Sequence, residues 1–137
     1  MGRLSIRTST WAIFLTGLVL IFCSSNIHWG GDRWRTILQS DAKGYHAYLP
    51  ALVLEGDPNF GSFDLIEGDR YFSENRFYDY RAYHEGHTTN KYFIGTAVMQ
   101  LPLFLVAHGI ALATGAEADG WSRPYVIADN LSSILFV

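Results

Sequence analysis

Three apolar stretches separated by polar sequence organise the chain. The first covers residues 11–27 and, at about 1.5 Å per residue, is just long enough for a helix to cross the apolar core of a bilayer. The second covers residues 93–114, and the third runs from residue 125 to residue 137. The pattern predicts an all-α membrane protein with an N-terminal transmembrane helix, a long extracytoplasmic loop with juxtamembrane amphipathic helices, and further membrane helices. Because the third stretch is still apolar at its last residue, we expect the N-terminal part of a longer polytopic protein.

Positive charge before the first stretch sets its expected orientation. Arg3 and Arg7 precede it and acidic residues come only after it, so the positive-inside rule places residues 1–10 in the cytoplasm and residues 28–92 outside. A cleavable signal peptide would begin in the same way, but the bulky sequence LIF near the end of the stretch lacks the small residues that cleavage requires. We therefore predict a retained first helix. Cys23 is the only cysteine, which excludes an intramolecular disulfide.

The outer loop is expected to begin with an amphipathic surface helix over residues 41–55. Ser40 or Asp41 can cap its start, and Pro50 should kink it or split it into two short pieces. A helix of this kind is suited to lying along the membrane surface. Its apolar face is predicted from side chains that recur at helical spacing: Tyr45, Tyr48, Leu49 and Leu52.

The remainder of the loop carries turn signals and then aromatic residues. Residues 56–68 are rich in turn-forming types, and Asp57, followed by proline, is typical of a turn. Residues 71–92 are polar and aromatic, and we expect them to be irregular, either as an interfacial aromatic belt or as the core of the loop.

Composition excludes some classes of function. The formal net charge of −3 and the absence of a long Lys/Arg cluster argue against nucleic-acid binding. The sequence HEGH at residues 84–87 lacks the helical H-E-x-x-H spacing of a zinc site, so no metal site is expected there. No cofactor is predicted, and only Asp41 and Asp57 would be candidate ligands if a divalent metal were required.

Three segments, in this order and spacing, carry a resemblance to a known class of enzyme. They are DAKGYHAYLP at residues 41–50, NKYFIGTA at residues 90–97 and ADGWSRPY at residues 118–125. From about residue 11 onward the chain resembles the GT-C class of integral membrane glycosyltransferases. It is most similar to bacterial members related to the dolichyl-phosphate-mannose protein mannosyltransferase and aminoarabinose transferase group.

The resemblance implies an enzyme of the bacterial inner membrane with a periplasmic active site. It would transfer a sugar, with inversion, from a polyprenyl-phosphate donor to a lipid or glycan acceptor. By position, Asp41 matches the acidic catalytic residue that acts on the acceptor, and Lys91 matches the basic residue near the donor phosphate. Phe93 departs from the family, whose members often carry proline there, and this leaves the local backbone geometry open. Further candidates for contact with the substrates are Tyr45, His46, Asp57 and Tyr92.

Each of the two main candidates has a simpler interpretation. Asp41 could be only a helix cap, and Lys91 could be an interfacial lysine whose stem lies along apolar surface. Asp57 is more often a turn residue than a group that positions an acceptor. His46, about one helical turn from Asp41, is expected to face the membrane interface or a sugar.

The topology of residues 93–114 has two solutions. They could form a second full span, or a membrane-embedded juxtamembrane helix, which would tolerate Gln100, Pro102 and His108 more easily than a lipid-facing span. The following loop has no cationic excess, which favours the embedded helix. Asp129 and Asn130, near the start of the third stretch, are either polar contacts between helices or residues of a helix start.

Two other classes of function compete with the enzyme. The chain could belong to a non-enzymatic membrane protein whose outer loop binds a partner, or to a transporter subunit. The substitution Asp41→Asn separates the first alternative from the enzyme, because it should abolish sugar transfer and leave partner binding intact. In all these cases membrane lipids surround the apolar helices.

Overall fold

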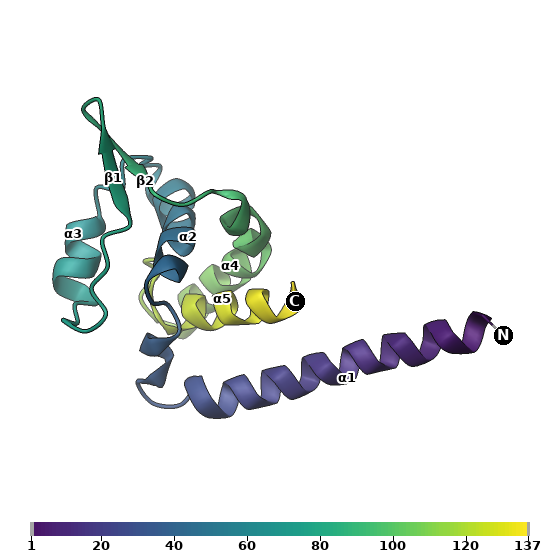
Figure 1. The fold of residues 1–137 in the computed structure, drawn as a ribbon. Helices are drawn as coiled ribbons and strands as arrows, with labels where there is room; N and C mark the ends of the chain where they lie inside the picture. The colour runs from purple at the N-terminus through teal and green to yellow at the C-terminus, as the bar shows by residue number, and fades with distance from the viewer. Residues whose placement is uncertain (1, 137) are drawn as a thin grey trace.

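The described part of the chain is mostly helical. The computed structural model describes residues 2–136, with side chains described from residue 8 onward. These residues form five α-helices, several shorter helical turns and one β-hairpin (Figure 1). The predicted predominance of helix is therefore confirmed, and the hairpin is an addition that the sequence pattern did not predict.

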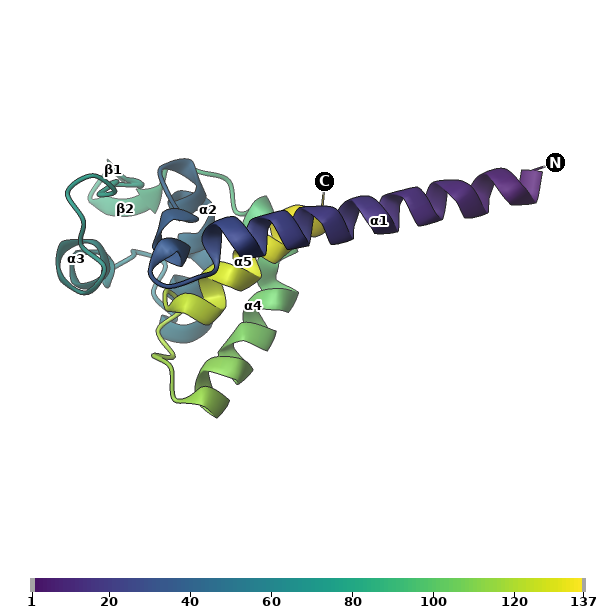
Figure 2. The same ribbon diagram turned by 90° about the horizontal axis from the view of Figure 1, so that it is seen from below.

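The N-terminal part of the first helix, α1 (Gly2–His28), projects away from the rest of the structure (Figures 1 and 2). We call the rest, residues 29–136, the head. The apolar side chains of α1 are exposed, with Ile13 at 74 %. By length and composition, α1 from Thr8 to His28 and α4 (Gly95–Thr114) could each cross a membrane. A row of bare apolar side chains is stable in lipid and unfavourable in water, because water orders around exposed apolar surface.

The second helix, α2, lies inside the head. It covers Asp41–Leu49, and Pro50 stands where it passes into a short π-helical segment, η2 (Pro50–Glu55). Proline has no backbone N–H for the regular helical ladder, which explains why the helix changes type at this residue. The expectation of a surface helix is corrected here, because Lys43, His46 and Ala47 are buried, whereas Leu52 of the predicted apolar face is exposed.

Two apolar clusters surround α2. The first joins α2 to a 3-10 helix, η1 (Arg33–Thr36), and to residues 71–92, which we call the aromatic loop. It also includes residues of α3 (Phe63–Leu65) and η3 (Ile66–Arg70). The second lies between α2, α4 and α5 (Arg123–Leu135). Members of the first cluster are Trp34, Leu38, Ala47, Ala51, Phe60, Phe63, Ile66, Tyr80, Trp121 and Val126. Since both clusters include residues of α2, burial of its two faces fixes the helix in the head.

The sequence HEGH forms the tip of the β-hairpin. Strands β1 (Arg81–His84) and β2 (His87–Asn90) pair in antiparallel register, with His84 opposite His87 and Arg81 opposite Asn90. The two turn residues, Glu85 and Gly86, have φ angles of 48° and 81°, which is the backbone of a tight primed hairpin turn. The prediction of irregular structure for residues 71–92 is therefore wrong for residues 81–90. The turn sets the pairing of the two strands, and the strands lack the alternation of apolar and polar residues by which a sequence pattern reveals a strand.

The last two helices take different directions relative to α1. Both views show α4 running across the direction of α1, whereas α5 runs back beside it (Figures 1 and 2). At the junction, Ser24 Oγ and Trp29 Nε1 donate hydrogen bonds of 2.5 and 3.0 Å to Asn130 Oδ1. Of the two interpretations open for Asn130, the structure selects a polar contact between helices.

A close approach inside the head leads to the first prediction. The ring of Tyr92 lies directly over Gly44, where an added Cβ would overlap ring carbons Cδ2 and Cε2. Gly44→Ala should therefore lower the free energy of unfolding by about 1–3 kcal/mol, the usual effect of overpacking. Thermal unfolding of the purified protein in detergent measures the change.

The matched control is Gly109→Ala in α4. An added Cβ meets nothing within 4 Å there. Since alanine favours helix over glycine by up to about 1 kcal/mol, this variant should be as stable as the parent or more so. Equal stability of the two variants would contradict the close contact between Gly44 and Tyr92.

Candidate active site around Asp41

Asp41 lies exposed at the first residue of α2. The residue before it, Ser40, is the N-cap and makes no side-chain capping bond. The Asp41 carboxylate is turned instead toward the aromatic loop, where its Oδ1 accepts a hydrogen bond of 2.6 Å from the hydroxyl of Tyr92. Ser40 Oγ donates a second, longer bond of 3.2 Å to the same oxygen. Within the described residues no donor reaches the other oxygen, Oδ2, so it is available to an incoming hydroxyl group.

The ring of Tyr92 connects Asp41 to two other tyrosines. Its centroid lies 4.9 Å from that of Tyr45, one turn along α2. Its hydroxyl also shares a short hydrogen bond with the hydroxyl of Tyr78. We call Asp41, Tyr45, Tyr78, Lys91 and Tyr92 the Asp41 site. Its aromatic faces are of the kind that pack against the apolar face of a sugar.

The backbone on either side of Tyr92 is fixed by hydrogen bonds to α2. Asn90 Nδ2 donates to the carbonyl of Gly44 at 2.8 Å, and Asn90 Oδ1 accepts from the backbone N–H of Tyr92 at 3.0 Å. The hydroxyl of Tyr48 donates to the Tyr92 carbonyl at 2.6 Å. The bonds to Gly44 and from Tyr48 hold the segment after β2 against α2, and the bond between Asn90 and Tyr92 fixes the backbone of that segment. The phenol of Tyr92 therefore reaches Asp41 in one defined position.

Tyr92 remains a hydrogen-bond donor at neutral pH. Its hydrogen bond to the Asp41 carboxylate, followed by the one it shares with Tyr78, raises the pKa of the Tyr92 phenol above its ordinary value. The phenol therefore keeps its proton, which it donates in the hydrogen bond that orients the Asp41 carboxylate.

Lys91 lies exposed beside the same tyrosines. Its Nζ donates to the carbonyl of Asp79 at 2.5 Å and lies 5.8 Å from the centroid of the Tyr78 ring. An ammonium group has three donors, so two remain for a ligand. Burial of the Asp79 carboxyl acts to raise its pKa, but hydrogen bonds from Arg81 outweigh this and hold the pKa below its usual range. The carbonyl that Lys91 contacts thus belongs to an ionised residue.

His46 lies in the core, and its expected place at the membrane interface or against a sugar is corrected. It is 1 % exposed, with Nε2 at 2.7 Å from the carbonyl of Gly120 and Nδ1 at 3.3 Å from Asp129 Oδ1. Its ring packs edge-on against Trp121, with centroids 5.0 Å apart. Asp129 is therefore also a contact between helices, and His46 is a structural residue rather than part of the Asp41 site.

Asp57 forms a turn and does not join the Asp41 site. Its two carboxylate oxygens accept hydrogen bonds of 2.8 and 2.7 Å from the backbone N–H groups of Asn59 and Gly61. These two bonds, in that order, lower the pKa of the Asp57 carboxyl. Of the two interpretations given above, the turn is the one that the contacts bear out.

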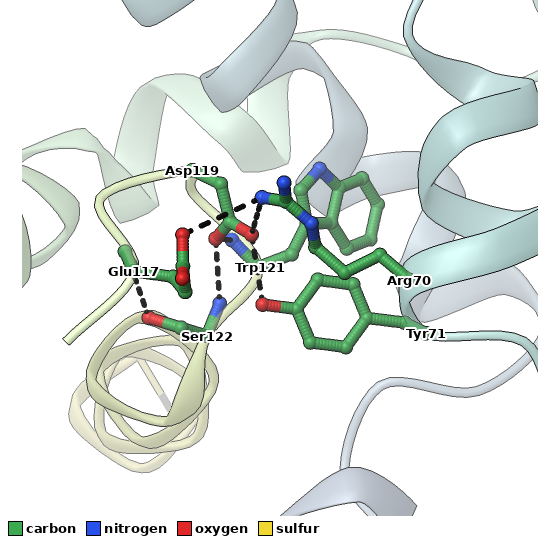
Figure 3. A network of polar contacts seen from close by, with 6 residues as sticks. All are labelled: Arg70, Tyr71, Glu117, Asp119, Trp121 and Ser122. Atoms are coloured by element: carbon green, nitrogen blue, oxygen red, sulfur yellow. Dashed lines mark hydrogen bonds and ion pairs between the residues drawn. The ribbon is translucent and has the colours of Figure 1, made fainter.

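A polar network ties the loop after α4 to the aromatic loop (Figure 3). Asp119 Oδ2 accepts hydrogen bonds from Arg70 at 3.1 Å and from the hydroxyl of Tyr71 at 2.8 Å. Asp119 Oδ1 accepts from the backbone N–H groups of Trp121 and Ser122 at 2.9 and 3.0 Å. Burial, and then the bond to Asp119, raise the pKa of Tyr71, which therefore stays neutral. One carboxylate thus holds the start of α5 against η3.

The sequence pattern missed Tyr78 and the structural parts played by Asn90 and Gly44. Tyr78 stood only within a long aromatic stretch, where no spacing distinguishes one tyrosine from another. Asn90 directly precedes Lys91, and Gly44 lies three residues after Asp41. The contact between Asn90 and Gly44 joins residues that are 46 positions apart in the chain. No local periodicity carries such a signal.

Comparison of the chain with known protein families, characterised proteins and solved structures gives no match.

Proposed function

We propose that the chain belongs to a membrane glycosyltransferase that uses a polyprenyl-phosphate-linked sugar. The observation that carries the proposal is the Asp41 site, in which an exposed carboxylate and an exposed ammonium lie on either side of a pair of hydrogen-bonded tyrosines. Sugar transfer needs a base for the acceptor, a cation for the leaving phosphate and aromatic surface for the sugar. The same five residues offer all three.

The proposed reaction proceeds in one displacement. Asp41 Oδ2 takes the proton from a hydroxyl group of the lipid or glycan acceptor, and the resulting oxygen nucleophile attacks the anomeric carbon of the sugar. The bond between that carbon and the phosphate oxygen breaks, and the configuration at the carbon inverts. Polyprenyl phosphate leaves with an additional negative charge, which Lys91 stabilises as a point charge.

The directions of the helices support a membrane arrangement for this chemistry. With α1 as a span, α4 lies along the membrane surface as an embedded helix, because it runs across α1 (Figure 2). Gln100 of α4 is buried inside the head, and Nδ1 of His108 lies 2.6 Å from the hydroxyl of Tyr125. Two polar residues of α4 are thus turned away from lipid in this arrangement. Phe93, Val98 and Leu112 are exposed and would contact acyl chains. In this arrangement α5 begins the next span, and residues 28–92 face the periplasm of a bacterial inner membrane.

Replacing the carboxylate should abolish the reaction. Asp41→Asn removes the base but can still accept the hydrogen bond from Tyr92, so the head should stay folded. We expect release of polyprenyl phosphate from a panel of polyprenyl-phosphate sugars to fall by roughly 10²–10⁴-fold, the usual contribution of a general base. The measurement uses membranes that contain the full-length protein.

Asp57→Asn is the matched control, since it makes the same chemical change in the same loop. It should retain most of the transfer, because its carboxylate serves only a turn. If Asp41→Asn were as active as the parent, the enzymatic proposal would fail, and the protein would be better described as a non-enzymatic membrane protein or a transporter subunit.

Tyr92 should act as a positioning residue. Tyr92→Phe keeps the ring over Gly44 and removes the hydroxyl that holds Asp41 Oδ1. We expect kcat to fall by about 10-fold with little change in KM, since a hydrogen bond to a charged group typically contributes about 1.5–3 kcal/mol. Asp41 would then be less well oriented for taking the proton of the acceptor. A raised KM with an unchanged kcat would instead indicate a simple binding role.

Cysteine labelling tests the membrane arrangement. In a Cys23→Ser background, single cysteines at positions 41, 91 and 119 should all react with a membrane-impermeant maleimide from the periplasmic side. Labelling of position 119 only from the cytoplasm would make α4 a full span. Cytoplasmic labelling of position 41 would exclude it from a periplasmic active site.

A further inference from the structure

A small polar cavity lies on the face of α2 opposite to Asp41. Its volume is about 40 Å³, room for roughly three water molecules. Lys43, two residues after Asp41, points into it, since successive helical residues are turned by about 100° and two steps reach the other side. Trp34, Tyr71 and Trp121 form its aromatic walls.

The cavity has an excess of positive charge. Lys43, Arg35 and Arg76 line it together with a single carboxylate, that of Glu67. Lys43 Nζ bonds Glu67 Oε2 at 2.5 Å and the carbonyl of Arg76 at 2.6 Å, and both charged side chains are almost fully buried. This pair neutralises itself, which leaves Arg35 and Arg76 as the other charged residues of the lining.

Neither guanidinium group has a strong internal counter-ion. The nearest carboxylate to Arg35 is Asp32, 4.0 Å away on a side chain that is 93 % exposed, so water screens the interaction. Across the described residues, Arg76 forms no ion pair with any carboxylate. The Arg35 guanidinium also lies 5.2 Å from the centroid of the Trp34 ring. Arginine side chains that lack a buried carboxylate partner are suited to oxyanions, which they bind through paired N–H donors.

The aromatic walls add no opposing charge. The Tyr71 hydroxyl donates to Asp119 and so stays neutral. Trp34 and Trp121 are buried members of the first apolar cluster, so they contribute uncharged wall to the cavity.

We propose that this cavity binds a phosphate monoester group, either on a lipid headgroup or as free phosphate. The two unpaired positive charges match the charge of about −1.5 to −2 that a phosphate monoester carries at pH 7. The volume is too small for a whole sugar or nucleotide. The site would lie beside the junction of α1 and α5, and it uses neither Asp41 nor Lys91, so it stands whether or not the proposed transferase reaction is right.

Tryptophan fluorescence can report binding, because two tryptophans line the cavity. The full-length protein in phosphatidylcholine nanodiscs is titrated with inorganic phosphate at constant ionic strength. We expect a saturable change in emission, and Arg76→Gln should weaken the apparent affinity by roughly 10-fold or more, as expected for the loss of one charge-assisted contact. Arg35→Gln provides a second variant if Arg76→Gln fails to fold, which thermal unfolding decides.

Arg33→Gln is the matched control. Arg33 lies in the same 3-10 helix as Arg35, makes the same change of charge when replaced, and does not line the cavity. The affinity of the Arg33→Gln variant for phosphate should stay within about two-fold of that of the parent, since exposed charges outside the cavity contribute little. An equal loss in Arg33→Gln and in the cavity variants would overturn the proposal, because it would indicate a diffuse surface charge.

A second arm distinguishes the two sources of the phosphate group. Nanodiscs that contain a minor fraction of phosphatidic acid should give the emission change without added phosphate if the cavity takes a lipid headgroup. If only soluble phosphate produces the change, the ligand is free phosphate. Absence of a saturable change in both kinds of nanodisc would refute the site.

Discussion

The head depends on the buried imidazole of His46. Its Nε2 must carry a proton to bond the Gly120 carbonyl, and its Nδ1 then faces a carboxylate oxygen of Asp129. One side chain of α2 thereby binds both the loop after α4 and the helix α5. Gly120 is required at its position, since φ is 84° and a Cβ there would lie 2.5 Å from Cβ of Pro50.

The Asp41 site is built on the element that His46 holds in place. Gly44, on the same helix, admits the ring of Tyr92, and Asn90 fixes the backbone next to it. The exposed carboxylate therefore rests on a buried framework, which is how precise geometry is usually maintained at a surface site. On the opposite face, the buried pair formed by Lys43 and Glu67 serves the same helix.

The sequence predicted the long helices well because their signal is local. Long apolar runs identify α1 and α4, and Pro50 marks the end of α2 because proline cannot continue the regular helical ladder. The burial of His46 was not predictable, because its partners are 74 and 83 residues away. The same holds for the contact of Asp41 with Tyr92, 51 residues apart, although both were candidates. The hairpin was missed because its strands are polar and its Glu-Gly turn is a weak signal compared with Asn-Gly.

The long reach of the His46 contacts also has a consequence for biosynthesis. During synthesis of the chain, residues 28–92 are made well before Gly120 and Asp129. During that interval His46 has no partner, and α2 cannot be buried on the face that α5 later covers. The head can therefore complete its fold only after α5 has been made, since contacts distant in sequence form late.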